Sequence, residues 1–187
     1  MSDTLFVIDL ETTGVVPATA GIIEIGCVAV QSGAIVGEFS SLVWPGREFL
    51  GPKNREVLAV SGITVEEVLD AWPLREVRYE LRRWVDGIGA AVPYRVTSYN
   101  VAFDAAFLPE PFWTRNRDDA GGGVWSECVM KCAARDLAGK SRLSLANACA
   151  ILGIEQEDAH RALPDARAAA AVWLALEGRN GGRSAPR

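Results

Sequence analysis

The sequence predicts an α/β domain with a mixed central sheet. Three observations lead to this class: β-rich apolar runs fill the chain up to Trp44, apolar residues at helical spacing dominate its C-terminal part, and strand and helix patterns alternate in between. A chain of 187 residues suffices for one domain with a hydrophobic core and is too short for two ordinary ones. We therefore expect a single domain over residues 1–177.

The N-terminal segment is expected to form three consecutive antiparallel strands. Apolar runs suited to strands cover residues 4–9, 21–30 and 34–44. The segment 31–33, Gln-Ser-Gly, has the length and the glycine of a hairpin turn. The first three strands should therefore lie side by side as a meander.

Helices and two further strands are expected next. Thr64 and Glu67 form a capping-box pattern ahead of the apolar run VEEVL, which indicates a helix start. The elements expected after it are a helix over 74–85, a fourth strand over 94–98, a helix over 102–108 and a short fifth strand after the polar loop 114–123. The sheet should therefore have five strands.

The C-terminal part is expected to be helical. Two amphipathic segments cover 128–137 and 143–153, the second ending on Gly153 in a C-cap position. A last helix should run from about Pro164 to Glu177, with proline in the first turn, where it is tolerated. Residues 178–187 are rich in glycine and arginine, so a disordered basic tail is expected.

The composition limits where the protein acts and what it binds. No apolar run approaches the ~20 residues that span a bilayer, and the first ten residues show no signal-peptide pattern, so we expect no membrane and a cytoplasmic location. The net charge of −5 argues against a broad basic surface for nucleic acid. Any contact with nucleic acid is then expected to be short and anchored at a metal.

The four cysteines are expected to be reduced and buried. Cys128 and Cys132 lie one helical turn apart and could supply half of a zinc site. The chain has one histidine and no C-x-x-C, however, and free cysteine is usually buried.

Two acids at the end of the first strand are the strongest local signal. Side chains on a strand alternate, so Asp9 and Glu11 share one face. An acid in an apolar run is costly to bury unless it is paired, and a divalent cation would relieve both burial and mutual repulsion. Taken alone, the pattern fits two interpretations equally well. In one, both acids bind a metal; in the other, Asp9 merely ends the strand and Glu11 lies in solvent.

Two more segments place polar groups at element junctions. Asp104 would lie in the first turn of the helix after the fourth strand, where helix capping alone explains an acid. His160 precedes the last helix on a loop, and Asp165 opens that helix after Pro164. A lone histidine is usually structural, but one on a loop can accept a proton from water near neutral pH.

The order of these three patterns resembles the DEDDh group of exonucleases, which includes the epsilon proofreading subunit of bacterial DNA polymerase III, ribonuclease T and oligoribonuclease. The resemblance rests on D-x-E at Asp9, N-x-x-F-D ending at Asp104, and H-x-x-x-x-D from His160 to Asp165, and it covers roughly residues 4–177. It implies a ribonuclease-H-like fold and two Mg²⁺ or Mn²⁺ ions. Asp9, Glu11, Asp104 and Asp165 would then be metal ligands and His160 the general base.

The resemblance also implies substrate contacts. In the segment 56–64, EVLAVSGIT, Glu56 would lie beside the terminal nucleotide, and Ser61 stands where relatives have a histidine. Thr12, Thr13 and Asn100 could contact the same nucleotide, although ordinary turn chemistry explains them equally well. Of the six tryptophans, Trp84 and Trp173 are expected in the core, whereas Trp72 and Trp113 could stack on bases.

The expected function is metal-dependent 3′→5′ exonuclease activity that releases nucleoside 5′-monophosphates from the free 3′ end of single-stranded DNA or RNA. Two alternatives remain open: an interaction module or proofreading subunit in a polymerase or repair complex, and a phosphodiesterase for short oligonucleotides. The sequence is compatible with a homodimer and with a polymerase partner.

Overall fold

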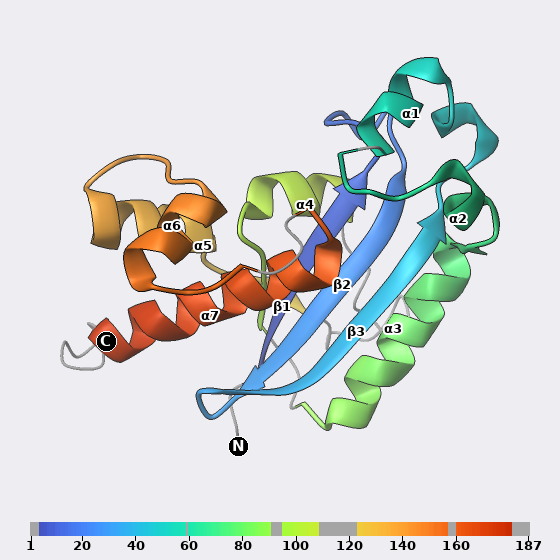
Figure 1. The fold of residues 1–187 in the computed structure, drawn as a ribbon. Coiled ribbons are helices and arrows are strands. Elements are labelled where there is room, and N and C mark those ends of the chain that lie inside the picture. Colours follow the sequence, from blue (N-terminus) through green and yellow to red (C-terminus); the bar gives the residue numbers. More distant parts are fainter. Residues whose placement is uncertain (1–3, 59, 91–94, 109–122, 157–159, 181–187) are drawn as a thin grey trace.

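A six-stranded mixed sheet forms the centre of the computed structural model, which describes residues 4–58, 60–90, 95–108, 123–156 and 160–180 (Figure 1). The strand order is β4-β3-β2-β1-β5-β6. The strands are β1 Thr4–Thr12, β2 Ile22–Gln31, β3 Ala34–Trp44, β4 Trp72–Pro73, β5 Arg95–Thr97 and β6 Val124–Trp125. Strands β1 to β3 are antiparallel, and β4, β5 and β6 each pair in parallel with a neighbour. The mixed α/β sheet is therefore confirmed.

The helices follow the expected order with two additions, at residues 47–49 and 52–58, and the expected helix over 128–137 is divided into two elements. They are η1 Arg47–Phe49, α1 Pro52–Leu58, α2 Val65–Leu69, α3 Leu74–Ile88, α4 Val101–Phe107, α5 Val129–Ala133, the π-helical η2 Ala134–Ala138, α6 Leu145–Leu152 and α7 Ala162–Asn180. The capping box at α2 is confirmed, because the hydroxyl of Thr64 accepts from the N–H of Glu67 and the Glu67 carboxylate accepts from the N–H of Thr64. Gly153 caps α6 in the left-handed conformation, as expected.

Several boundaries differ from the sequence prediction. The sheet has one strand more than the five expected, and the additional strand is β4. It has only two residues, one of them a proline, so the sequence shows no strand pattern there. Helix α7 begins at Ala162, before the expected Pro164, and continues to Asn180, beyond the expected Glu177. Arg179 in its last turn is favourable for the helix dipole. Residues 181–187 of the expected disordered tail lie outside the described residues.

Helices cover both faces of the sheet. Leu5 and Val7 of β1 pack in a core cluster with residues of α5, α6 and α7. Phe6 and Ile8, which point the other way, pack in a second cluster with α3. Figure 1 shows α7 crossing the sheet on one side and α3 running along β3. By this alternation, Asp9 and Glu11 lie on the face that α7 covers.

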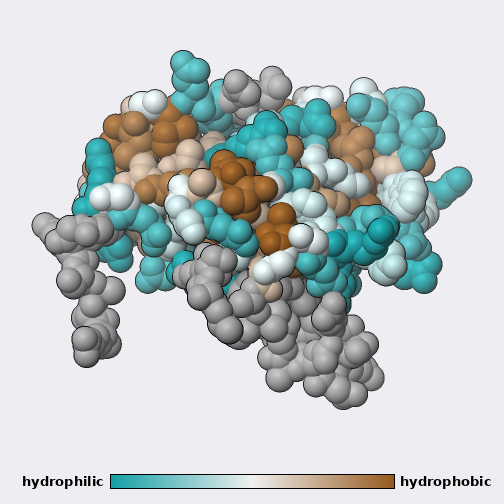
Figure 2. All heavy atoms as spheres, turned by 90° about the horizontal axis from the view of Figure 1, so that it is seen from below, coloured by the Kyte–Doolittle hydropathy of each residue, from teal (hydrophilic) through white to brown (hydrophobic). Residues whose placement is uncertain are grey.

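Core and surface follow the expected distribution. Trp173 is buried, and the partly buried Trp84 packs edge-to-face on Phe6, so both were correctly expected in the core. All four cysteines are free and buried, as expected. On the face in Figure 2, hydrophobic side chains lie in separate patches between hydrophilic ones. In the part of the chain that the structure describes, no helix combines the length and apolar character needed to cross a bilayer.

Candidate active site

The pairing of β1 with β2 sets the positions of the first two acids. In this register Asp9 lies opposite Gly26, and Glu11 lies opposite Glu24. Directly paired residues present their side chains on the same face of a sheet. Two consecutive pairs on the α7 side of the sheet therefore bring together three acids and one glycine.

Gly26 lets the start of α7 lie directly on the sheet. A Cβ atom at this position would stand 2.3 Å from the carbonyl carbon of Ala162 and 2.4 Å from the backbone nitrogen of Leu163. Atoms of a real side chain do not approach backbone so closely. Only glycine accommodates this contact, which places the first turn of α7 beside Asp9.

Glu24 fixes the same helix start through its carboxylate. Arg161 donates to it from Nε (3.0 Å to Oε2) and from Nη2 (2.8 Å to Oε1), and the N–H of Ala162 adds a bond of 2.9 Å. The Glu24 side chain is 3% exposed, so these donors satisfy a charge that would otherwise be costly to bury. The preceding residue, His160, has φ 71°, which is uncommon for a non-glycine residue. The bonds of Arg161 and Ala162 to Glu24 thus anchor the backbone immediately after His160.

Asp9, Glu11 and Asp165 converge at this point. One carboxylate oxygen from each lies within 4.8 Å of the other two. Among the described residues this is the one group of three or more histidine, cysteine, aspartate or glutamate side chains close enough to hold a metal; Cys128 and Cys132 are not part of such a group. Three oxygen donors are the ligand type that Mg²⁺ and Mn²⁺ prefer, so the residues fit a hard divalent cation.

Hydrogen bonds from neighbouring residues orient Glu11 and Asp165. The hydroxyl of Ser61 donates to Oε2 of Glu11 at 2.7 Å. Asp165 accepts from Nε2 of Gln156 at 2.6 Å and from the backbone N–H of His160 at 3.3 Å. Each acid keeps further lone pairs for another ligand.

The electrostatics of the cluster favour a bound cation. Burial, together with the neighbouring Asp104, Asp165 and Glu11, holds the pKa of Asp9 well above its usual range. Burial also raises the pKa of Glu11 to about 7, against the lowering effect of the Ser61 hydroxyl. Without a metal, Asp9 and Glu11 are consequently hard to ionise at neutral pH, and a positive charge between them would remove that penalty.

Asp104 joins the same cleft from α4. Its side chain is buried, and burial raises its pKa to about 7. The cleft has a volume of about 400 Å³, and its lining includes Asp9, Glu11, Asp104 and Asp165; among the residues that the structure describes, no lysine or arginine lines it. Asp104 is not in the three-acid group but raises the pKa of Asp9 by its charge.

The expected substrate contacts lie in different environments. Thr12 and Asn100 line the cleft, and the Thr12 hydroxyl donates to the carbonyl of Gly14 at 2.7 Å. The buried hydroxyl of Thr13 instead accepts from the N–H of Gly21 and from Asn54. Glu56 is exposed on α1 and is not among the residues lining the cleft.

Two other expected residues, His160 and Trp72, are described and do not line the cleft. His160 is exposed and not in the lining set, although its backbone bond to Asp165 keeps it next to the acids. Trp72 is exposed on β4. This strand lies three positions from β1 in the sheet, which corresponds to about 14 Å across the strands. Trp113 lies outside the described residues.

The sequence prediction missed Glu24, Gly26 and Arg161. A signal was present for Glu24, which interrupts the apolar run IIEIG just as Asp9 interrupts the run on β1. Gly26 and Arg161 gave no comparable signal, because their importance depends on where α7 docks.

The fold and the acid cluster together define a ribonuclease-H-like α/β protein with a candidate cation site at the end of its first strand. Residues 6–173 match the sequence model of the RNase_T family, described as exonuclease. The chain belongs to this exonuclease family.

Two of the curated relatives carry the name of DNA polymerase III. The chain is 32% identical over 173 residues to "DNA polymerase III PolC-type" of Thermotoga maritima, covering 91% of this chain but only 12% of that one. It is 27% identical over 176 residues to "DNA polymerase III subunit epsilon" of Aquifex aeolicus, covering 94% of this chain and 81% of that one. The chain therefore spans about an eighth of its PolC-type relative and four fifths of the epsilon subunit.

Solved structures share the fold. Exonuclease X in complex with 5′ overhanging duplex DNA superposes with a TM-score of 0.70 at 29% identity, covering 95% of this chain and 93% of that one. The nuclease domain of 3′hExo, a DEDDh family member bound to rAMP, superposes with a TM-score of 0.73 at 18% identity, covering 96% and 94%. At that identity the second match shows the fold alone.

Proposed function

We propose that this chain is a metal-dependent 3′→5′ exonuclease that removes nucleoside 5′-monophosphates from single-stranded DNA or RNA. The observation that carries the proposal is the convergence of Asp9, Glu11 and Asp165 from β1 and α7 in one cleft. Membership in the exonuclease family supports it. Action in the cytoplasm is part of the same proposal.

The acids would hold two Mg²⁺ or Mn²⁺ ions, with Asp104 as the fourth ligand. Such a pair of ions, when bound, stabilises the attacking and the leaving oxygen of a phosphodiester displacement. The charges of Asp104, Asp165 and Glu11 all act on Asp9, so Asp9 would help to hold the bound ions. Ser61 and Gln156 hold the orientations of Glu11 and Asp165 through the bonds described above.

His160 is proposed as the general base. His160 is exposed and lies one residue before the Glu24–Arg161 anchor, and its ring would accept a proton from the attacking water. Anchoring after His160 restricts the backbone that carries the ring, which favours a defined position for proton transfer.

A polymerase or repair complex is the second candidate setting. The similarity to the epsilon subunit of DNA polymerase III along most of both chains favours it. A role confined to short oligonucleotides differs only in substrate length, and the products of digestion distinguish it.

Digestion of a 5′-labelled single-stranded oligonucleotide tests the proposed activity. With Mg²⁺ we expect labelled products that shorten one nucleotide at a time, and with EDTA or in Asp9→Asn we expect none. Immediate release of a labelled mononucleotide would overturn the polarity, and full activity in EDTA would overturn the metal requirement. Matched DNA and RNA in single-stranded, duplex and mismatched form then define the substrate.

A further inference from the structure

A second hollow lies next to the catalytic cleft and is larger, about 530 Å³ against about 400 Å³. The two share Asn100, the residue that precedes α4. A strand held by its 3′ end in the cleft can therefore continue past Asn100 into the second hollow.

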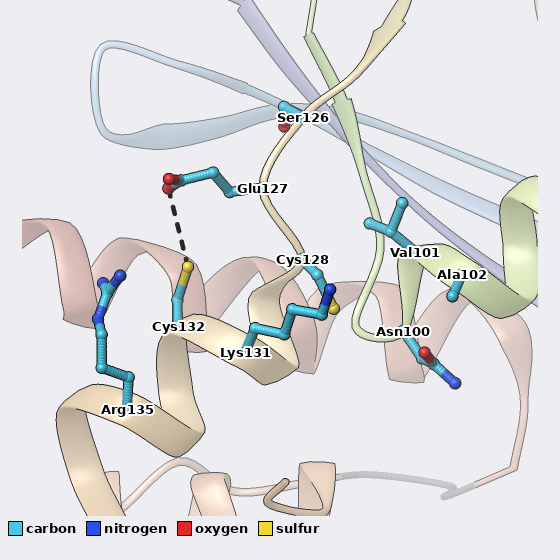
Figure 3. Close-up of a pocket in the computed structure, with 9 residues that line it drawn as sticks. All are labelled: Asn100, Val101, Ala102, Ser126, Glu127, Cys128, Lys131, Cys132 and Arg135. Carbon is cyan, nitrogen blue, oxygen red and sulfur yellow. Dashed lines mark hydrogen bonds between the residues drawn. The ribbon is translucent and has the colours of Figure 1, made fainter. Parts of the chain in front are cut away.

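One wall of this hollow is a single face of α5 and η2. Cys128, Lys131, Cys132 and Arg135 follow one another at the spacing of neighbouring positions on a helix surface. Figure 3 shows Lys131 and Arg135 extending from this wall, with the thiol of Cys132 directed at the carboxylate of Glu127. The start of α4, with Val101 and Ala102, lines the hollow as well.

The charge of the hollow contrasts with that of the cleft. In the part of the chain that the structure describes, two cations, Lys131 and Arg135, and one acid, Glu127, line the hollow, whereas acids and no lysine or arginine line the cleft. Arg135 bonds to its neighbour Asp136, but the arginine side chain is 65% exposed, and exposed pairs of this kind are weak. Its guanidinium therefore remains able to bind a second anion.

A nucleic-acid strand needs such cations outside the cleft. Bound metal ions can neutralise the phosphate at the reacting end, but the phosphates upstream meet a protein of net charge −5. Positive charge close to the cleft lowers the cost of holding these upstream phosphates.

We propose that this second hollow is an upstream subsite, in which Lys131 and Arg135 contact backbone phosphates of the substrate strand. The proposal rests on the proposed exonuclease function and adds to it a preference for strands longer than a dinucleotide. The contacts are to the backbone, so the subsite discriminates by length and not by base sequence.

The test compares Lys131→Gln/Arg135→Gln with Lys140→Gln/Arg142→Gln. The control removes the same two charges from exposed positions a few residues further on, which do not line the hollow. Each variant is assayed on a dinucleotide and on a single-stranded dodecanucleotide over a range of salt concentrations, and circular dichroism checks that it is folded.

We expect the KM of the first variant for the dodecanucleotide to rise by about 10-fold, with kcat and dinucleotide hydrolysis unchanged. The slope of log KM against log salt should fall by about 1.4, because each phosphate contact on a single strand contributes about 0.7. The control should remain near wild type. An equal effect of both variants, or an equal loss on the dinucleotide, overturns the subsite.

A binding measurement tests the subsite independently of the proposed activity. Fluorescence anisotropy measures the Kd of a labelled dodecanucleotide for protein carrying Asp9→Asn, which should not digest it. If the wild-type chain cleaves nothing, the proposed function fails, while a Kd raised about 10-fold by the Lys131 and Arg135 substitutions still supports the subsite. An unchanged Kd refutes it whatever the activity.

Discussion

Adding one methyl group at Gly26 tests how the start of α7 positions the acid cluster. The new Cβ would lie 2.3 Å from the carbonyl carbon of Ala162, and ordinary contacts begin at 3.4 Å. The first turn of α7 must therefore retreat by roughly 1 Å from β2. Asp165 lies in that turn, so its carboxylate should move away from Asp9 and Glu11.

The expected cost of Gly26→Ala is larger for catalysis than for folding. Inserting a methyl group into a packed site costs about 1–3 kcal/mol of stability, whereas a displacement of about 1 Å in a catalytic group can cost about 100-fold in rate. We expect kcat on a single-stranded oligonucleotide to fall by about 100-fold and half-saturation to require more Mg²⁺. A cooperative transition in urea unfolding should show that the variant is still folded in the absence of urea.

Gly178→Ala is the matched control for this substitution. It makes the same chemical change in the same helix, where a Cβ meets nothing within 4 Å. The control should be fully active and slightly more stable, since alanine is favoured over glycine in a helix. Activity of Gly26→Ala within about threefold of the control would refute the argument that this contact sets the geometry of the site.

Three further perturbations address the charges of the site. Metal-free protein should become less stable as pH rises from about 4.5 to about 7, because Glu11 and Asp104, with pKa values raised to about 7, retain protons in the folded state that the unfolded chain has released. Thermal unfolding in EDTA checks this, and a higher Tm at pH 8 than at pH 5.5 would contradict it. Ser61→Ala removes the 2.7 Å bond to Glu11 and should weaken Mg²⁺ activation by about 10-fold to 100-fold, seen in a metal titration of activity; an unchanged titration speaks against an orienting role. Arg161→Met leaves the Glu24 carboxylate buried with fewer donors and should cost about 2–3 kcal/mol in urea unfolding, the lower end because Arg161 is 39% exposed. Adding Glu24→Gln should recover part of that loss, and no recovery would argue against a charge-pair origin.

Sequence patterns were sufficient for the parts of the fold that depend on local chemistry. Strands β2 and β3 and their hairpin follow from long β-rich runs separated by a short glycine-containing turn. The capping box fixed the start of α2 at Val65. Helix α1 was missed, since seven residues give too little periodicity to separate a helix from a loop.

The acids of the site were also accessible from the sequence, but their support was not. An acid within an apolar strand is a local anomaly, and the order of the three motifs tied Asp9, Glu11, Asp104 and Asp165 together. The Glu24–Arg161 pair joins residues 137 positions apart, and nothing local to either one announces the other. The hydroxyl of Ser61 donates to Glu11, a bond that the sequence did not reveal, and its expected contact with substrate stays a prediction.

The register of β1 and β2 has a consequence for protein design. Two alternate residues on β1 are candidate metal ligands, and the two residues opposite them on β2 contact the start of the helix that carries the third candidate ligand. A designer who grafts only the acids onto another sheet would transfer ligands without the scaffold that aligns them. The smallest portable unit is two strands with D-x-E beside E-x-G, together with a helix that begins over the glycine.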